Sequence, residues 1–349
     1  MRWVAWDDAG VLTGRETAPA TFAATAHRHR DRPALVEVLA DGARRTTSWG
    51  ALARTVRHLS VALADDGFEA GQVLAVDVAG TAGDRATTLL VGAAVGAVLA
   101  VDAGAPIDVG GLLPRGVALD ERRPDRFERL VAERRPHDVL LRCGAVDHTH
   151  ASLLIAARSL AQGAGLGVDD RLLVDLSPGS AADAVLSVIV PCLTGAASWT
   201  SPTDFAIGDL DEASGPTFVA STDAAPEAAT SSRRLGRRRP AAPSRSIVVV
   251  GDGGAAGPPG DSGPSLVALS VEAAGGVVAG FGVGHSMGRP LPGVTLAIDD
   301  DGGVLVRSGG VAPGAPGLRD DGWLATGRRG RLDGGALVLD REPATLGAA

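Results

Sequence analysis

Cysteine and histidine side chains gather in one short stretch, "RCGAVDHTH", which contains Cys143, His148 and His150. Thiolates and imidazoles act as nucleophiles and as metal ligands, so the stretch raises a catalytic and a metal-binding interpretation. In an extended chain His148 and His150 would lie on opposite faces, and the nearby sequence offers no third ligand. We therefore expect neither function here, and interpret Cys143 and Cys192 as small buried apolar residues.

A glycine-rich turn follows an apolar run in "IVVVGDGGAA" (247–256). It satisfies the dinucleotide pattern G-x-G-x-x-A, and Glu272 follows at the roughly twenty-residue distance of a ribose-binding acid. However, that pattern requires a helix to begin inside the turn, and Pro258, Pro259 and Pro264 follow instead. We therefore reject a dinucleotide site.

The composition of the 349 residues excludes several other chemistries. The chain has no lysine, so a Schiff base or a phosphate-binding lysine is excluded. A net charge of −8 argues against a nucleic-acid partner, and we interpret the basic run at 233–239 as a solvated loop. Two cysteines indicate the cytoplasm rather than a disulfide framework. The longest apolar stretch, 89–105, falls short of the ~20 residues of a membrane span, so we expect no membrane partner.

Alternating strands and helices must position these residues. Residues 32–49 read as two strands joined at Asp41-Gly42, and 48–71 as an amphipathic helix capped by Ser48. Patterns typical of a strand and of a helix continue to alternate along the chain to about residue 200. This alternation predicts an α/β fold with layered, mostly parallel sheets. We expect a core over 1–285 made of two βα subdomains, with a mobile loop at about 201–245. Short strands and Asp-Gly turns predict a small antiparallel β-region over 286–349.

Taken in order, these pieces resemble the adenylate-forming superfamily, which includes acyl-CoA synthetases and the adenylation domains of peptide synthetases. The segments that carry the resemblance are "RDRPALV", "TTSWGALARTVRHLSVALADDGFEAGQVLAV", "HTHASLLIAARSLAQGAGLGVDDRLLVDLSP", "PCLTGAA", "IVVVGDGGAA", "GRPLPGVTLAI" and "DGWLATGR". The resemblance implies the N-terminal domain of that superfamily. The chain stops at Ala349, so we expect a truncated form without the C-terminal lid domain that carries the catalytic lysine.

The resemblance also implies site residues, with ATP and magnesium as cofactors. Glu272, in "ALSVEAAGG", matches the catalytic glutamate that coordinates magnesium. Gly253, Gly254 and Ala255 match the turn that lines the adenine pocket. Arg341 matches an arginine that contacts the ribose.

Two departures from the superfamily pattern concern the nucleotide. The segment before "HTH" normally holds ATP phosphates with a Ser/Thr/Gly-rich loop, but here it is only "RCGAVD" (142–147), and Asp147 adds negative charge. Arg328 stands where an aspartate accepts hydrogen bonds from the ribose, and arginine has no acceptor. We expect Arg328 to pair instead with an acid such as Asp333.

We carry two functional hypotheses. The first is a degenerate pseudoenzyme that is non-catalytic alone and binds a small carboxylic acid, an acyl group or a protein partner. The second is an ATP- and magnesium-dependent carboxylate-activating enzyme, similar to an acyl-CoA ligase, that uses divergent residues or a lid supplied by another polypeptide. The sequence leaves enzymatic activity open.

Overall fold

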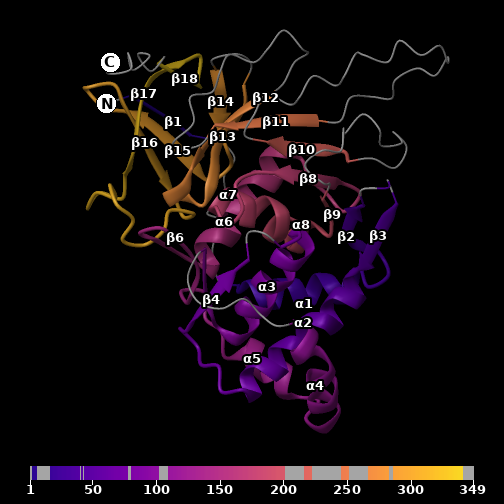
Figure 1. The fold of residues 1–349 in the computed structure, drawn as a ribbon. Coiled ribbons are helices and arrows are strands. Elements are labelled where there is room, and N and C mark those ends of the chain that lie inside the picture. The colour runs from indigo at the N-terminus through magenta and orange to yellow at the C-terminus, as the bar shows by residue number, and fades with distance from the viewer. Residues whose placement is uncertain are drawn as a thin grey trace, which may run out of the picture.

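Two β-sheets, with helices between and beside them, form the fold (Figure 1). The computed structural model describes residues 2–5, 16–39, 41, 43–77, 80–101, 109–200, 216–221, 245–250, 266–282 and 286–340. Within these residues one sheet is 14-stranded and the other is 4-stranded. None of the helices in this part of the chain combines the length and the apolarity that a membrane span requires.

The large sheet has the strand order β1-β15-β16-β17-β18-β14-β13-β12-β11-β10-β8-β9-β2-β3. Its strands in chain order are β1 (Arg2–Ala5), β2 (Pro33–Val38), β3 (Arg44–Ser48), β8 (Arg171–Asp175), β9 (Ala197–Thr200), β10 (Phe218–Ser221), β11 (Arg245–Val250), β12 (Leu266–Val271), β13 (Gly276–Gly282), β14 (Ser286–Pro290), β15 (Val294–Ile298), β16 (Gly303–Ser308), β17 (Leu324–Asp333) and β18 (Ala336–Leu339).

One half of this sheet is parallel, as the alternation of strands and helices predicts. Strands β2, β9, β8, β10, β11 and β12 are parallel to their neighbours in that order. Parallel neighbours need crossover connections, and helical residues 181–194 supply the one between β8 and β9. Strand β10 forms within 201–245, where the sequence indicated a loop, and the rest of that segment other than 216, 217 and 245 lies outside the described residues.

The other half of the sheet is antiparallel, from β12 through β13 and β14 to β18, β17, β16, β15 and β1. Turns at Asp-Gly and Gly-Gly pairs separate several of these strands, and Gly302, Gly334 and Gly335 adopt positive φ there. The sequence predicted the antiparallel strands from residue 286 onward, but not the antiparallel pairing of β12 with β13. It did not predict β1, whose four residues carry no turn or alternation signal and which pairs with β15.

The helices and helical turns are α1 (Ala18–Arg28), α2 (Trp49–Asp65), α3 (Ala82–Val95), α4 (Val109–Arg122), α5 (Arg126–Ala132), α6 (His150–Ala164), α7 (Ala181–Ala184), the π-helix η1 (Val185–Ile189), α8 (Val190–Thr194) and the 3-10 turn η3 (Glu272–Ala274). Helix α2 begins as predicted, since the Ser48 hydroxyl accepts from the Ala51 N–H. Helices α4 and α5 were not predicted. Helix α4 lies so close to α2 that a Cβ at Gly116 would come 2.1 Å from the His58 carbonyl oxygen.

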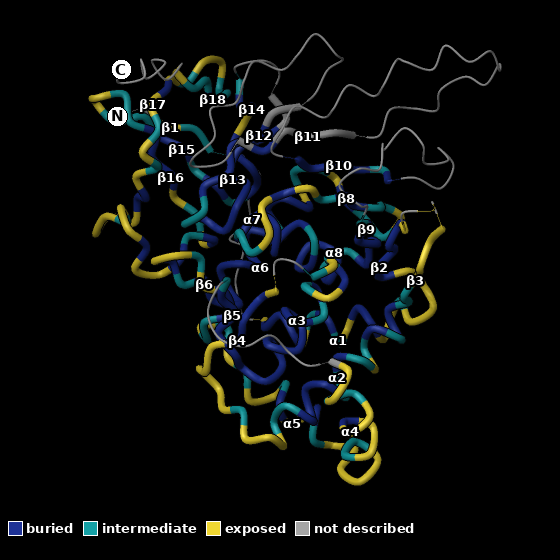
Figure 2. Tube along the Cα trace, in the orientation of Figure 1, coloured by how far each residue is buried: buried dark blue, intermediate teal, exposed yellow. Residues whose placement is uncertain are grey.

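Helix α6 occupies the centre of the molecule. It contacts α8, β13 and β7, and its leucines Leu153, Leu154 and Leu160 are fully buried. A helix that is apolar on every side is stable only when other elements cover all of it, and Figure 2 shows α6 buried among its neighbours. The residues that begin α6 are therefore placed by the protein core.

The small sheet presents the residues of "RCGAVDHTH". Its order is β4 (Val73–Val76), β5 (Val98–Val101), β6 (Val139–Cys143) and β7 (Val146–Thr149). The first three strands are parallel, whereas β6 and β7 are antiparallel and form a hairpin. Strand β7 runs directly into α6.

Candidate functional site

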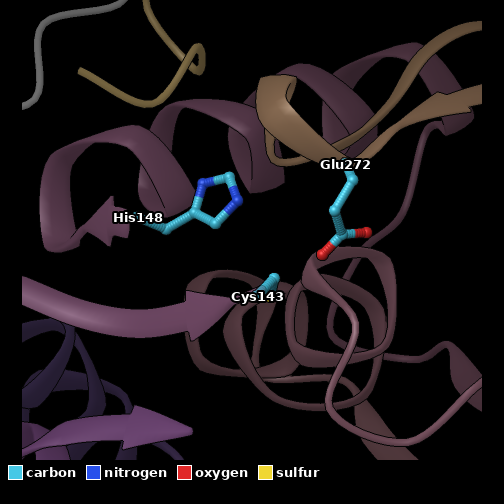
Figure 3. Close-up of side chains that lie close together, drawn as sticks. All are labelled: Cys143, His148 and Glu272. Atoms are coloured by element: carbon cyan, nitrogen blue, oxygen red, sulfur yellow. The ribbon is translucent and has the colours of Figure 1, made fainter. Parts of the chain in front are cut away.

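Three side chains from different parts of the fold converge beside the β6–β7 hairpin: Cys143, His148 and Glu272 (Figure 3). Cys143 ends β6, His148 lies in β7, and Glu272 begins η3 after β12. One ligand atom of each, the Sγ, a ring nitrogen and a carboxylate oxygen, lies within 4.8 Å of the other two.

The register of the hairpin explains why Cys143 and His148 meet. Cys143 pairs with Val146, so only two residues form the turn. Arg142 is opposite Asp147, and Leu141 is opposite His148. Because side chains alternate along a strand, Cys143 and His148 share one face as diagonal neighbours.

The opposite face of the hairpin carries an ion pair. Arg142 donates from Nε to Asp147 Oδ1 at 2.6 Å and from Nη2 to Oδ2 at 3.0 Å. The bond from Arg142 lowers the pKa of the Asp147 carboxyl below its usual value. The carboxylate is therefore ionised at neutral pH, and the guanidinium already has an anionic partner.

His148 is fully buried, and among the described residues its ring nitrogens make no hydrogen bond of normal length and angle, only a weak contact with the Glu272 backbone. Burial lowers the pKa of His148 to about 4, and the nearby Glu272 backbone and Asp147 charge oppose that shift only in part. The ring is therefore neutral at pH 7, with one nitrogen lone pair available.

The next two residues of "HTH" have structural roles. The Thr149 hydroxyl accepts from the Ser152 N–H at 3.1 Å and caps α6, and the Ser152 side chain completes a capping box. The buried His150 accepts at Nδ1 from the Ala18 N–H at 3.3 Å, at the start of α1. The only hydroxyl between β6 and the first residue of α6 thus serves the helix terminus.

Cys143 is half-buried and forms no disulfide. Its thiol donates to the Gly179 carbonyl at 3.4 Å. Burial, reinforced by the charge of Glu272, raises the pKa of the thiol far above its usual range, so the metal-free group is a thiol at neutral pH. Cys192 is fully buried in the core, as predicted.

The position of Glu272 is fixed from both sides. Its Oε1 accepts from the Ala181 N–H at 2.7 Å, at the first turn of α7. The turn that follows Glu272 needs glycine, because Gly276 has φ +106° and a Cβ there would come 3.0 Å from the Ala182 Cα. The close approach of this turn to α7 brings the carboxylate to the hairpin.

The structure does not describe the other residues that the resemblance singled out. Gly253, Gly254, Ala255 and Arg341 lie outside the described residues, as do the basic run and most of the 247–256 turn.

The Thr-Gly-Arg segment lies in β17 of the large sheet, whereas the hairpin belongs to the small sheet. The Thr326 hydroxyl donates to the Val304 carbonyl at 2.9 Å and accepts from the Arg328 N–H at 3.2 Å. The pairing of Arg328 with Asp333 stays a prediction.

Sequence reasoning missed the cluster for two reasons. It interpreted 142–147 as a shortened loop, although apolar or soft residues at 141, 143, 146 and 148 alternate with charged ones at 142 and 147. That alternation, around a Gly-Ala turn, was the available signal for a hairpin. The approach of Glu272, far along the chain, had no such signal.

Comparisons with known proteins identify the fold. No protein-family model matches the sequence, and a search of the curated proteins finds no match. The structure is similar to the adenylation domain of a keto acid-selecting NRPS module bound to keto acyl adenylate, with a TM-score of 0.74 and 15% identity over 97% of this chain and 82% of that chain. It is similar to a long-chain-fatty-acid-CoA ligase from Archaeoglobus fulgidus, with a TM-score of 0.71 and 13% identity over 96% and 85% of the two chains.

A third similar structure is an isolated domain. It is the N-terminal domain of FACL13 from Mycobacterium tuberculosis, with a TM-score of 0.66 and 17% identity over 93% of this chain and 100% of that chain. The chain therefore has the α/β fold of the N-terminal domain of adenylate-forming enzymes.

Proposed function

We propose that this chain uses the adenylate-forming fold as a scaffold that is non-catalytic by itself and binds a small carboxylate, an acyl group or a protein partner. The observation that carries the proposal is the β6–β7 hairpin. It occupies the place where the resemblance implies a loop for the ATP phosphates. A two-residue turn leaves no such loop.

The chemistry of the hairpin supports this proposal. Phosphate groups are bound by converging N–H groups, hydroxyls and cations. The hairpin contributes the carboxylate of Asp147, the guanidinium of Arg142 is already paired with it, and the Thr149 hydroxyl caps α6. The described residues therefore do not fit a triphosphate at this place, and we derive no nucleotide chemistry from them.

The alternative is an ATP- and magnesium-dependent carboxylate-activating enzyme, and one observation favours it. The chain is similar over nearly all of its length to an adenylation domain bound to keto acyl adenylate. In that case Glu272 would hold magnesium, while Gly253, Gly254, Ala255 and Arg341 would contact the nucleotide. Arg328 argues against this enzymatic alternative, because a guanidinium cannot accept a hydrogen bond from a ribose hydroxyl.

Calorimetric titration of the full chain with magnesium-ATP, and with AMP in parallel, separates the two functions. The proposal predicts no saturable heat at millimolar nucleotide. A Glu272→Gln variant serves as the matched control, because loss of the metal ligand would weaken magnesium-ATP and leave AMP unaffected. Saturable ATP binding with that dependence on Glu272 would overturn the proposal, and carboxylic acids would then be screened for adenylate formation.

We further infer a cytoplasmic protein with neither nucleic-acid nor membrane partners. The net charge of −8 supports the absence of a polyanionic partner. The two reduced cysteines are compatible with a reducing compartment.

A further inference from the structure

We propose that Cys143, His148 and Glu272 form a binding site for a divalent transition metal of the zinc class. The three residues come from the end of β6, from β7 and from η3. This inference goes beyond the proposed function and does not depend on it. It also differs from the magnesium role that the resemblance implies for Glu272, because it adds a thiolate and an imidazole.

The spacing of the three groups suits a shared ion. The sulfur, nitrogen and oxygen ligand atoms lie within 4.8 Å of one another. With zinc bonds of roughly 2.0–2.3 Å, tetrahedral ligand atoms lie about 3.4–3.6 Å apart. Rotation of the partly exposed Cys143 side chain would bring its sulfur closer to the other two ligand atoms.

The second observation is the state of His148. A fully buried imidazole normally has hydrogen bonds at its nitrogens, and an unsatisfied buried polar group is costly. Neither nitrogen of His148 makes a hydrogen bond of normal length and angle in the described part of the chain, where a weak contact with the Glu272 backbone is all that faces them, and the ring faces the other two residues (Figure 3). A metal ion bonded to one nitrogen would give that buried lone pair a partner.

The donor set selects the type of ion. A thiolate and a carboxylate together carry two negative charges, which balance a divalent cation in a partly buried site. Thiolate and imidazole ligands favour zinc and its neighbours over magnesium. Three protein ligands leave a fourth position for water or a small ligand, as in zinc sites that stay open.

Binding replaces one interaction of Cys143. The S–H proton leaves to solvent, the Sγ forms the metal bond, and the 3.4 Å hydrogen bond to the Gly179 carbonyl is lost. Glu272 keeps its 2.7 Å bond from the Ala181 N–H, which orients the carboxylate. Such supporting bonds are typical of metal ligands.

A cysteine-histidine nucleophile is the competing interpretation of the same residues. It requires a hydrogen bond from the thiol to a ring nitrogen. Here the Cys143 thiol donates to the Gly179 carbonyl and not to a ring nitrogen of His148. The geometry therefore favours the metal site.

Cobalt titration of the EDTA-treated full chain tests the site, because tetrahedral cobalt with a thiolate ligand gives a charge-transfer band in the near ultraviolet. We expect the band to saturate at one equivalent and to disappear on addition of zinc. Cys143→Ser should abolish the band. His148→Asn and Glu272→Gln should each weaken cobalt binding at least about 100-fold.

The matched control is Cys192→Ala, which removes the other cysteine and should leave the band unchanged. Circular dichroism checks that each variant is folded. If Cys143→Ser does not fold, the cobalt titrations of the wild type and of Glu272→Gln test the proposal instead. Absence of the band in the wild type, or its persistence without Cys143, would overturn the proposal. Rapid alkylation of the metal-free thiol at pH 7 would favour the nucleophile instead.

Discussion

We expect His150 to make the protein sensitive to mild acid. Burial lowers the pKa of His150 to about 4, and its Nδ1 accepts from the Ala18 N–H at the start of α1. Protonation would remove that acceptor and place a cation at the positive end of a helix. We therefore expect the His150→Gln variant, which keeps an acceptor and cannot be protonated, to lose less stability than the wild type on acidification.

The sign and the magnitude follow from the two pKa values. The unfolded chain has the ordinary histidine pKa of 6.5 and the folded chain a pKa of about 4, so the unfolded state binds the proton more tightly. The contribution of His150 is complete above pH 6.5 and is lost as the pH falls from 6.5 toward 4. At pH 5 the loss is about 2 kcal/mol, at 1.36 kcal/mol per pKa unit.

The assay is urea unfolding at pH 7, 6 and 5 in the presence of EDTA, followed by circular dichroism. Between pH 7 and pH 5 the free energy of unfolding of His150→Gln should fall by about 2 kcal/mol less than that of the wild type. Buried His148 is present in both proteins and cancels in the comparison. His27→Gln, at an exposed position of α1, should behave like the wild type. Equal losses in the wild type and His150→Gln would refute the reasoning.

Three further substitutions test how helices α2, α4 and α6 are packed and capped, each by its free energy of unfolding. Gly116→Ala should destabilise by about 1–3 kcal/mol because its Cβ would contact the α2 backbone, whereas Gly167→Ala, with no atom within 4 Å of the new Cβ, should not; equal effects would contradict the packing. Thr149→Ala should cost about 1 kcal/mol through loss of the α6 capping box, and no change would mean that the cap is dispensable. Arg57→Ala removes two 2.7 Å bonds to one carboxylate and should cost about 1–2 kcal/mol, while Arg32→Ala, in a more exposed ion pair, should change little; the reverse order would show that burial does not govern these pairs.

Sequence patterns within one segment predicted the elements whose formation depends on capping residues and on the spacing of apolar residues. Helix α2 was predicted because apolar residues recur at helical spacing behind the Ser48 cap, and both features are confirmed. The parallel strands β2, β8 and β9 followed from the alternation of strands and helices, whereas β10 was missed because its segment carries little periodicity. Helix α4 was missed because Pro114 and its glycines are poor helix formers, and its packing on α2 overrides that weakness.

The cluster required information that local patterns do not contain. Cys143 and His148 meet only if 144 and 145 form a two-residue turn, and a one-residue change in register would place them on opposite faces. Glu272 is positioned beside the hairpin by the pairing of β12 with β13 and by the close contact of Gly276 with α7. These are tertiary constraints, and periodicity within one segment cannot report them.

The tip of the β6–β7 hairpin has a consequence for engineering. Gly144 and Ala145 are exposed, and no atom lies within 4 Å of a Cβ built at Gly144, so a longer segment can leave the tip without a clash. Lengthening a flexible loop costs only about 0.6 kcal/mol per doubling. The hairpin is therefore a suitable insertion point. Grafting a phosphate-binding loop between Cys143 and Val146 would test directly whether this scaffold can bind a nucleotide.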